Sequence, residues 1–251
     1  MRNTTFRGAG LIGAVLVTGG VLTGAGTAQA AGFGAAGVTV TTEATGTAGA
    51  SDAPGAARVL TPAIAAGLAD LGGADFTKAS ARVTVPTLAP CAVGGPVSGS
   101  SGPVARSGLS FGGGTTTCGT ETTDPASHLT TRTSTANGKN FELSALVGAG
   151  GPRLRLSGYT ATCAATRTQT HASWSLSGLS GTAALPSPVP ANYVRPLTSS
   201  NGTVLANAVF NVQTLPGDGS VSLTMLRFDL LPASGSTGSV TVGRTACSPT
   251  P

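Results

Sequence analysis

The residues of this sequence that could carry chemistry are few. Its 251 residues include two histidines and four cysteines, which are Cys91, Cys118, Cys163 and Cys247. Structural zinc sites bring their thiolates in closely spaced pairs, whereas these four cysteines are spread widely along the chain. An even number of cysteines in an exported chain is typical of a disulfide framework. We therefore expect two disulfides.

Four cysteines allow three connectivities, and the sequence alone leaves all three open. Our prediction is Cys91–Cys118 with Cys163–Cys247. In the chain-entropy treatment, closing the longer of these loops stabilises the fold by about 4.5 kcal/mol and closing the shorter by about 3.5 kcal/mol.

Acid, base and nucleophile candidates do not assemble into a known motif. His128 lies in the polar stretch TDPASHLTT, and His171 falls on the serine-bearing side of a predicted strand. Neither a Gly-x-Ser-x-Gly elbow nor a Ser-x-x-Lys motif occurs. Glu142 and Asp229 are strand acids that could face each other as a glycosidase pair, but isolated strand acids usually face solvent. We predict no catalytic residue and expect the protein not to be an enzyme.

Metal and cofactor sites are not predicted either. Asp218 lies in a turn and could bind Ca²⁺, but it offers one carboxylate where six to eight oxygen ligands are needed. The glycine-rich stretch 112–119 lacks the Lys-Ser/Thr that ends a phosphate-binding loop, and we expect it to be a loop leading to Cys118.

Two residues are candidate ligand contacts. Tyr193 and Arg195 lie in the proline-rich stretch PSPVPANYVRPL, which we expect to form an edge or extended segment. Trp174 shares a strand face with Ala172 and Leu176, and we interpret it as a core anchor rather than a carbohydrate-stacking platform.

Charge and composition exclude nucleic acid as a partner. The formal net charge is +5, but only 9% of residues are charged and 4% are aromatic. Nucleic-acid binding calls for clustered basic residues with interleaved aromatics, and the arginines here are scattered singly.

The first 30 residues read as an export signal. Arg2 and Arg7 precede an apolar run from Leu11 to Leu22, and Ala28-Gln29-Ala30 is a signal-peptidase pattern that places cleavage before Ala31. The alternative, a membrane anchor, needs an apolar stretch of about 20 residues, and this run is shorter and rich in glycine. We expect a secreted protein with no transmembrane segment in the mature chain.

After the signal, residues 31–57 are small and polar, and we interpret them as a flexible lead-in with one edge-strand patch at Val38–Thr42. Residues 58–251 then form the predicted domain. One short helix is predicted near the start of this domain. Thr61 is a suitable N-cap and Pro62 suits the first helical position. Ile64, Leu68 and Leu71 have helical spacing, and Gly72 can end the helix.

From Ala81 onward the pattern is β. Alternating short segments are separated by Gly, Pro and Asn, which is typical of an antiparallel β-sandwich. The alternating segments are 82–85, 141–145, 153–156, 171–176, 204–212 and 240–242. Asn137-Gly138 predicts a tight turn.

The strand at 221–230 changes the face on which its apolar residues lie. Val221, Leu223 and Met225 alternate on one side, and Leu226 and Phe228 continue on the other. Pro216–Gly219 predicts a hairpin with the preceding strand. We expect a β-bulge near Met225-Leu226, because an extra residue shifts register; the alternative is a central strand buried on both faces.

Several stretches resemble the choice-of-anchor P family of exported actinobacterial proteins. They are SALVGAGGPRLRLSGYTATCAATR, NGTVLANAVFNVQTLPGDGSVSLTMLRFDLL and GSVTVGRTAC, within residues 130–247. The resemblance implies a β-rich extracellular domain, favours pairing Cys163 with Cys247 and brings no catalytic activity. Family members carry surface-attachment signals after the domain, and no sorting motif follows Cys247 here, so covalent anchoring is not expected.

These observations predict a non-catalytic secreted or cell-surface domain with a structural or interaction role. The alternative is a module that binds a cell-wall glycan or a surface protein through loops at one end of the sandwich. A secreted hydrolase with dispersed catalytic residues is the third hypothesis, which a pocket holding two carboxylates would favour.

Overall fold

Side chains that alternate between core and solvent build two antiparallel sheets. The computed structural model describes residues 40–44, 67–124 and 129–250 of the chain. The predicted signal peptide with Ala28, Ala30 and Ala31, most of the lead-in, and His128 lie outside the described residues. Within them the structure is all-β, and the helices are 3₁₀ turns of three residues, Val147–Ala149 and Pro232–Ser234.

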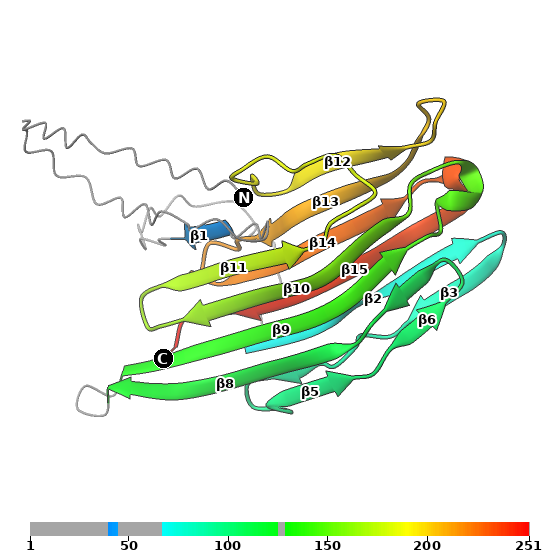
Figure 1. Ribbon diagram of the computed structural model, residues 1–251. Helices are drawn as coiled ribbons and strands as arrows, with labels where there is room; N and C mark the ends of the chain where they lie inside the picture. The colour runs from blue at the N-terminus through cyan, green and yellow to red at the C-terminus, as the bar shows by residue number, and fades with distance from the viewer. Residues whose placement is uncertain (1–39, 45–66, 125–128, 251) are drawn as a thin grey trace, which may run out of the picture. The chain divides into compact units, whose positions relative to one another are not determined.

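The eight-stranded sheet, here the front sheet, lies before the other layer in Figure 1. Its strand order is β1-β11-β10-β9-β7-β6. In addition, β8 pairs with β9, and β5 pairs with β8. Its strands are β1 (Val40–Ala44), β5 (Ser98–Ser101), β6 (Val104–Arg106), β7 (Leu109–Phe111), β8 (Gly114–Asp124), β9 (Leu129–Leu143), β10 (Leu154–Ala165) and β11 (Thr170–Ser177).

The seven-stranded back sheet has the order β12-β13-β14-β15-β2-β3, with β4 also paired to β2. Its strands are β2 (Gly67–Lys78), β3 (Ala81–Val85), β4 (Cys91–Ala92), β12 (Tyr193–Thr198), β13 (Val204–Thr214), β14 (Val221–Leu230) and β15 (Ser236–Cys247). The edge strand expected near Val38–Thr42 is β1, which pairs with β11. The proline-rich segment supplies β12, an edge strand of the back sheet, as expected.

The core lies between the sheets and is closed by two cystines. Phe141 of β9 stacks on Phe228 of β14 with ring centroids 5.8 Å apart, and Phe111 meets Phe141 edge-on at 5.2 Å. Cys91 of β4 is bonded to Cys118 of β8, and Cys163 of β10 to Cys247 of β15. This is the predicted pairing, and each cystine joins the front sheet to the back sheet.

The predicted helix is wrong from Gly67 onward, and its first residues lie outside the described part. Leu68 and Leu71 belong to β2, where Ala69 and Leu71 are fully buried at a spacing of two. Gly72 does not end a helix. Its positive φ of 114° sits within β2, where a Cβ would come within 2.1 Å of the Thr241 carbonyl oxygen. Pairing with β15 overrides the local helical spacing.

The bulge expected in β14 is also wrong. The buried face of β14 changes at a row of residues that crosses the back sheet. Pairings on both sides of Met225 keep one register with β13 and β15. Asn211 and Gly243, which lie opposite Met225, have positive φ of 55° and 64°. The change of face therefore occurs without an extra residue, and Met225 and Leu226 are both fully buried. We call this row the back crease.

The front sheet has a matching row, the front crease. The register between β9 and β10 is continuous, but the buried positions change from Leu156 to Tyr159. Asn140, opposite this change, has a positive φ of 50°. Two further expectations fail here. Asn137-Gly138 lies inside β9 rather than in a turn, and the glycine-rich stretch 112–119 is mostly β8.

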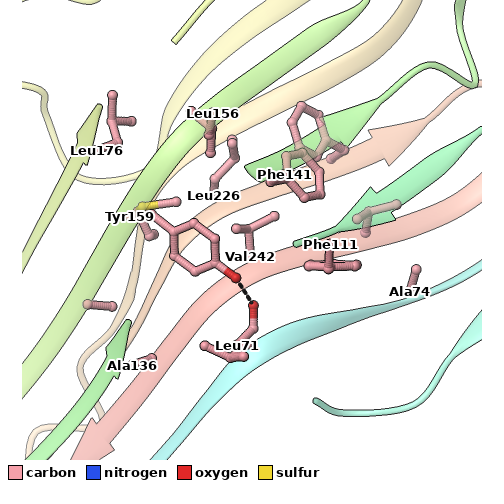
Figure 2. Packing of buried hydrophobic residues seen from close by; sticks show 14 of the residues in the cluster. Leu71, Ala74, Phe111, Ala136, Phe141, Leu156, Tyr159, Leu176, Leu226 and Val242 are labelled. Carbon is pink, nitrogen blue, oxygen red and sulfur yellow. Dashed lines mark hydrogen bonds between the residues drawn. The ribbon is translucent and has the colours of Figure 1, made fainter. Parts of the chain in front are cut away.

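Gly138 is required by packing rather than by a turn. A Cβ on Gly138 would lie 2.0 Å from Cζ of Tyr159. The Tyr159 ring therefore occupies the space that a side chain at position 138 would fill. Figure 2 shows this ring reaching across the core toward Leu71 of β2. The hairpin predicted at Pro216–Gly219 is confirmed, because β13 and β14 are antiparallel neighbours.

Candidate functional site

The outer face of the front sheet carries aligned hydroxyl and amide side chains. Alternation places one residue in two of each strand outward, and the register brings these residues into two rows from β5 to β11. One row is Ser98, Thr117, Thr135, Thr162 and Ser173; the other is Ser100, Thr115, Asn137, Thr160 and Ser175. We call these two rows the hydroxyl face.

Neighbouring strands connect within this face. The Thr160 hydroxyl donates to Oδ1 of Asn137 at 2.8 Å, and the hydroxyls of Thr135 and Thr162 lie 3.4 Å apart. Neither row contains a charged residue. The hydroxyl face is therefore a neutral surface of hydrogen-bond donors and acceptors.

Three adjacent hollows run across the front sheet beside this face. The largest, about 870 Å³, lies over β5 to β8 and the Lys139–Asn140 part of β9. The second, about 410 Å³, shares Ser110 and Asn140 with it. The third, about 300 Å³, continues at Gly158 and Ser177. Together these hollows form the crease groove, which crosses the strands along the front crease.

Glycines shape the crease groove. Gly112 and Gly114 lie in the first hollow, and Gly138 and Gly158 lie in the third. A Cβ on Gly112 would lie 2.6 Å from the Lys139 carbonyl oxygen, so a side chain there would displace the backbone. The groove has a backbone floor with Ser, Thr and Asn side chains along its length.

An ion-pair cluster lines the second hollow. The Glu142 carboxylate accepts a hydrogen bond of 2.7 Å from Arg153 and one of 2.8 Å from Arg155. The hydrogen bond from Arg155 and the positive charge of both arginines lower the pKa of Glu142. A carboxylate held ionised by two guanidinium groups is a poor general acid. This cluster therefore provides a charged rim to the groove.

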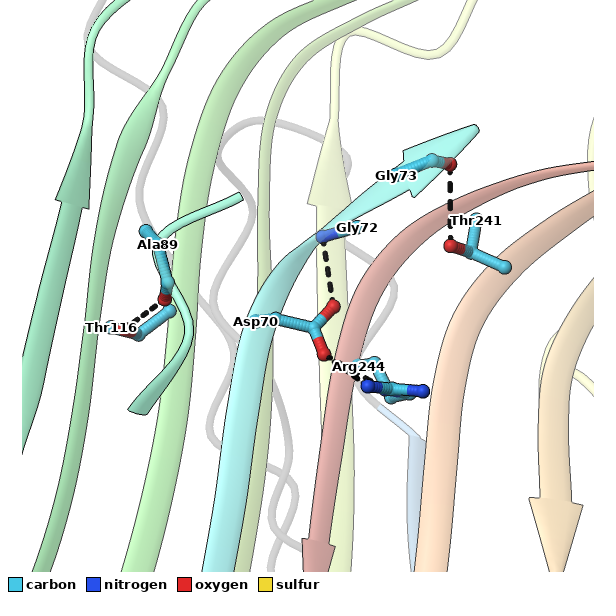
Figure 3. A network of polar contacts seen from close by, with 7 residues as sticks. All are labelled: Asp70, Gly72, Gly73, Ala89, Thr116, Thr241 and Arg244. Carbon is cyan, nitrogen blue, oxygen red and sulfur yellow. Dashed lines mark hydrogen bonds and ion pairs between the residues drawn. The ribbon is translucent and has the colours of Figure 1, made fainter. Parts of the chain in front are cut away.

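A separate hollow of about 310 Å³ on the back sheet is lined by a buried carboxylate, Asp70. Figure 3 shows its contacts with Gly72 and Arg244. The side chain of Asp70 is 3% exposed. Its Oδ1 accepts the Gly72 amide at 3.0 Å, and its Oδ2 accepts Arg244 Nε at 2.8 Å. Burial raises the pKa of Asp70, and the charge of Arg244 opposes that rise.

This hollow also reaches Asp75, but the two acids do not form a catalytic pair. Five residues of strand separate them, which is roughly 16 Å at the usual rise, whereas glycosidases hold their carboxylates about 5–9.5 Å apart. Asp75 is bound by Arg82 at 2.6 Å, and this hydrogen bond lowers the pKa of Asp75. Both carboxylates therefore form ion pairs with arginines.

Tyr193 and Arg195 lie on one face of β12 and contact each other. The Arg195 guanidinium carbon is 5.7 Å from the Tyr193 ring centroid, and Arg195 donates to the Ala184 carbonyl at 2.9 Å. Both side chains are half-buried, and they lie away from the crease groove on a strand of the other sheet. Their role as ligand contacts stays a prediction.

The other candidate residues are dispersed. Trp174 is 2% exposed and belongs to the core, as expected. Glu142 and Asp229 do not face each other, because β9 and β14 belong to different sheets and both acids point outward from the sandwich. His171 lies half-exposed on β11 with the serines. Asp218 accepts both the amide and the hydroxyl of Ser220 and so closes the β13–β14 turn.

Within residues 40–44, 67–124 and 129–250, no group of three or more His, Cys, Asp or Glu side chains is placed to hold a metal ion. Among the same residues, no helix is long and apolar enough to span a membrane.

Comparison with protein-family models, with curated proteins and with solved structures found no match to this chain.

Proposed function

We propose that the protein is a non-catalytic interaction domain that works outside the cytosol, either released or loosely held at the cell surface. Its two inter-sheet cystines suggest an oxidising compartment. The export signal read from residues 1–30 and the resemblance to the choice-of-anchor P family support secretion and a surface role.

The observation that carries this proposal is the contrast between the two kinds of surface. The hollows contain three carboxylates, and each forms an ion pair with arginine. They are Asp70, Asp75 and Glu142. The hydroxyl face, which borders the crease groove, instead presents neutral hydrogen-bonding groups over several strands. A surface of this kind can hold a partner but offers no acid, base and nucleophile in one place.

A binding role is favoured over a purely structural one by the groove itself. Binding sites are concave and combine apolar lining with a few polar groups. The first hollow places Pro103, Val104 and Phe111 beside Ser100, Thr115 and Asn140. This differs from the expected use of loops at one end of the sandwich, because the concave surface lies on the face of a sheet.

The test is a pull-down with the purified mature domain, residues 31–251, on isolated cell wall, immobilised glycans and surface-protein extracts. We expect saturable retention on one of these classes and no change in the retained material over hours. Release of soluble sugar or peptide fragments would contradict the non-catalytic assignment, and absence of retention on all three would contradict a binding role.

A further inference from the structure

We infer that the crease groove binds one extended chain of a neutral polysaccharide, which lies across the strands of the front sheet. This inference rests on the proposed binding function and assigns its ligand class and site. It is carried by the adjacency of the three hollows and by the chemistry of their lining.

The groove has the form of an extended subsite rather than a closed pocket. Its first two hollows share Ser110 and Asn140, and the third begins at the residue next to Ser157 in the second. Strands in a sheet are about 4.8 Å apart, so a ligand that crosses from β8 to β11 contacts side chains at a short and regular interval. A linear polymer of similar units meets such a series of contacts, whereas a compact metabolite fills only one hollow.

The lining selects a neutral ligand that is rich in hydroxyl groups. Thr115, Asn137, Thr160 and Ser175 offer both donors and acceptors. The charges beside them cancel in part, since the single negative charge of Glu142 is shared by Arg153 and Arg155 and one positive charge is left over. Lys139 contributes a single positive charge at the rim of the first hollow.

Other ligand classes fit less well. A nucleic acid or acidic polymer would need a series of cations along its path, whereas the net positive charge here is two, from Lys139 and from the arginine in excess over the single charge of Glu142. Protein hot spots are built from aromatic and arginine anchors in central pockets, and Phe111 here is 2% exposed. Pro103 and Val104 provide a small apolar patch suited to the CH-bearing face of a sugar ring.

The experiment is native affinity electrophoresis of the mature domain in gels that contain a soluble β-1,4-glucan, a β-1,3-glucan, a mannan or an acidic polygalacturonate. The groove variant combines Asn137→Ala with Thr160→Val. The matched control is Thr133→Val, an exposed residue of β9 that lies outside all three hollows. Equal thermal midpoints would establish that each variant folds.

We expect retardation in at least one neutral gel, with affinity reduced about thirtyfold in the groove variant, since two hydrogen bonds of about 1 kcal/mol each are affected. Thr133→Val and added salt should leave the retardation unchanged. Retardation that is equal in the groove variant would overturn the site.

The remaining outcomes separate the inference from the proposed function. Retardation only in the acidic gel, abolished by Lys139→Gln or salt, would overturn the neutral ligand while leaving a binding role. No retardation in any gel, together with retention of a protein in the pull-down, would overturn the inference and leave the proposed function intact. Failure in both experiments would overturn both.

Discussion

The hydroxyl of Tyr159 donates a hydrogen bond of 2.8 Å to the carbonyl oxygen of Leu71, across the core from one sheet to the other (Figure 2). Leu71 lies in the back crease opposite Gly243, where the regular pairing between β2 and β15 is interrupted. Burial raises the pKa of Tyr159, so the hydroxyl stays protonated as a donor. This contact joins the two creases.

Tyr159→Phe should destabilise the fold by about 1–3 kcal/mol, because it leaves a buried carbonyl without its donor. Urea unfolding of the variant measures this cost. Tyr193→Phe is the control, since Tyr193 is half-buried on the edge strand β12. Equal stability of Tyr159→Phe and the unmodified domain would show that the inter-sheet hydrogen bond has no energetic role.

Gly138→Ala tests whether Tyr159 sets the identity of residue 138. The added methyl would lie 2.0 Å from the ring, and overpacking of this kind costs about 1–3 kcal/mol. In a Tyr159→Leu background the cost should largely disappear. Gly119→Ala is the matched control, because a Cβ there meets no atom within 4 Å. Strictly additive effects in the double variant would contradict the steric explanation.

The two sheets were largely predictable, and the creases were not. Alternation identified the strands around Val83, Leu156 and Val242, and the pairing predicted among the three possible ones is the one the structure shows. Gly72 and Asn137-Gly138 were misread because their roles depend on partners far away in sequence, Thr241 and Tyr159. Local rules interpret such glycines as helix ends or turns. The groove was missed for the same reason, since it is formed where several strands change face together.

One sequence signal did point to the back crease. Leu226 follows Met225 directly, and both are apolar in an otherwise alternating strand. A bulge was the local interpretation, but a change of face needs no register shift when Asn211 and Gly243 opposite take positive φ. In future sequences, a phase change in one strand opposite a Gly or Asn in its neighbours would indicate a crease.

Arg244→Gln should destabilise the domain in a pH-dependent manner. At pH 7 the variant leaves the ionised Asp70 buried without its partner, at a cost of about 3 kcal/mol. Burial already raises the pKa of Asp70, so its contribution to stability is fully present below the ordinary pKa and is lost as pH rises through the raised value. Removing Arg244 raises that pKa further. The cost should therefore shrink as pH falls and Asp70 becomes protonated.

The measurement is the free energy of unfolding between pH 4 and pH 7. Arg82→Gln serves as the control, because Arg82 and Asp75 form an exposed pair whose loss should change stability little. A cost for Arg244→Gln that is constant with pH would contradict the assignment of Asp70 as the group responsible.

Two inward-facing threonines should respond in opposite directions to the same change. In the described part of the chain, the fully buried Thr245 hydroxyl has no hydrogen-bond partner, whereas the buried Thr116 hydroxyl donates to the Ala89 carbonyl at 2.5 Å. Thr245→Val should stabilise by about 1 kcal/mol, because it removes an unsatisfied polar atom, and Thr116→Val should destabilise by about 1–2 kcal/mol. Thermal denaturation of both variants tests this, and destabilisation by Thr245→Val would contradict it.

The most direct test of a cystine-braced domain that works outside the cytosol is mass spectrometry of the exported protein, as an intact chain and as peptides digested without reductant. We predict a chain that begins at Ala31, has no reactive thiol, and yields the linked peptides Cys91–Cys118 and Cys163–Cys247. A chain that keeps residues 1–30 and carries free thiols would contradict the account.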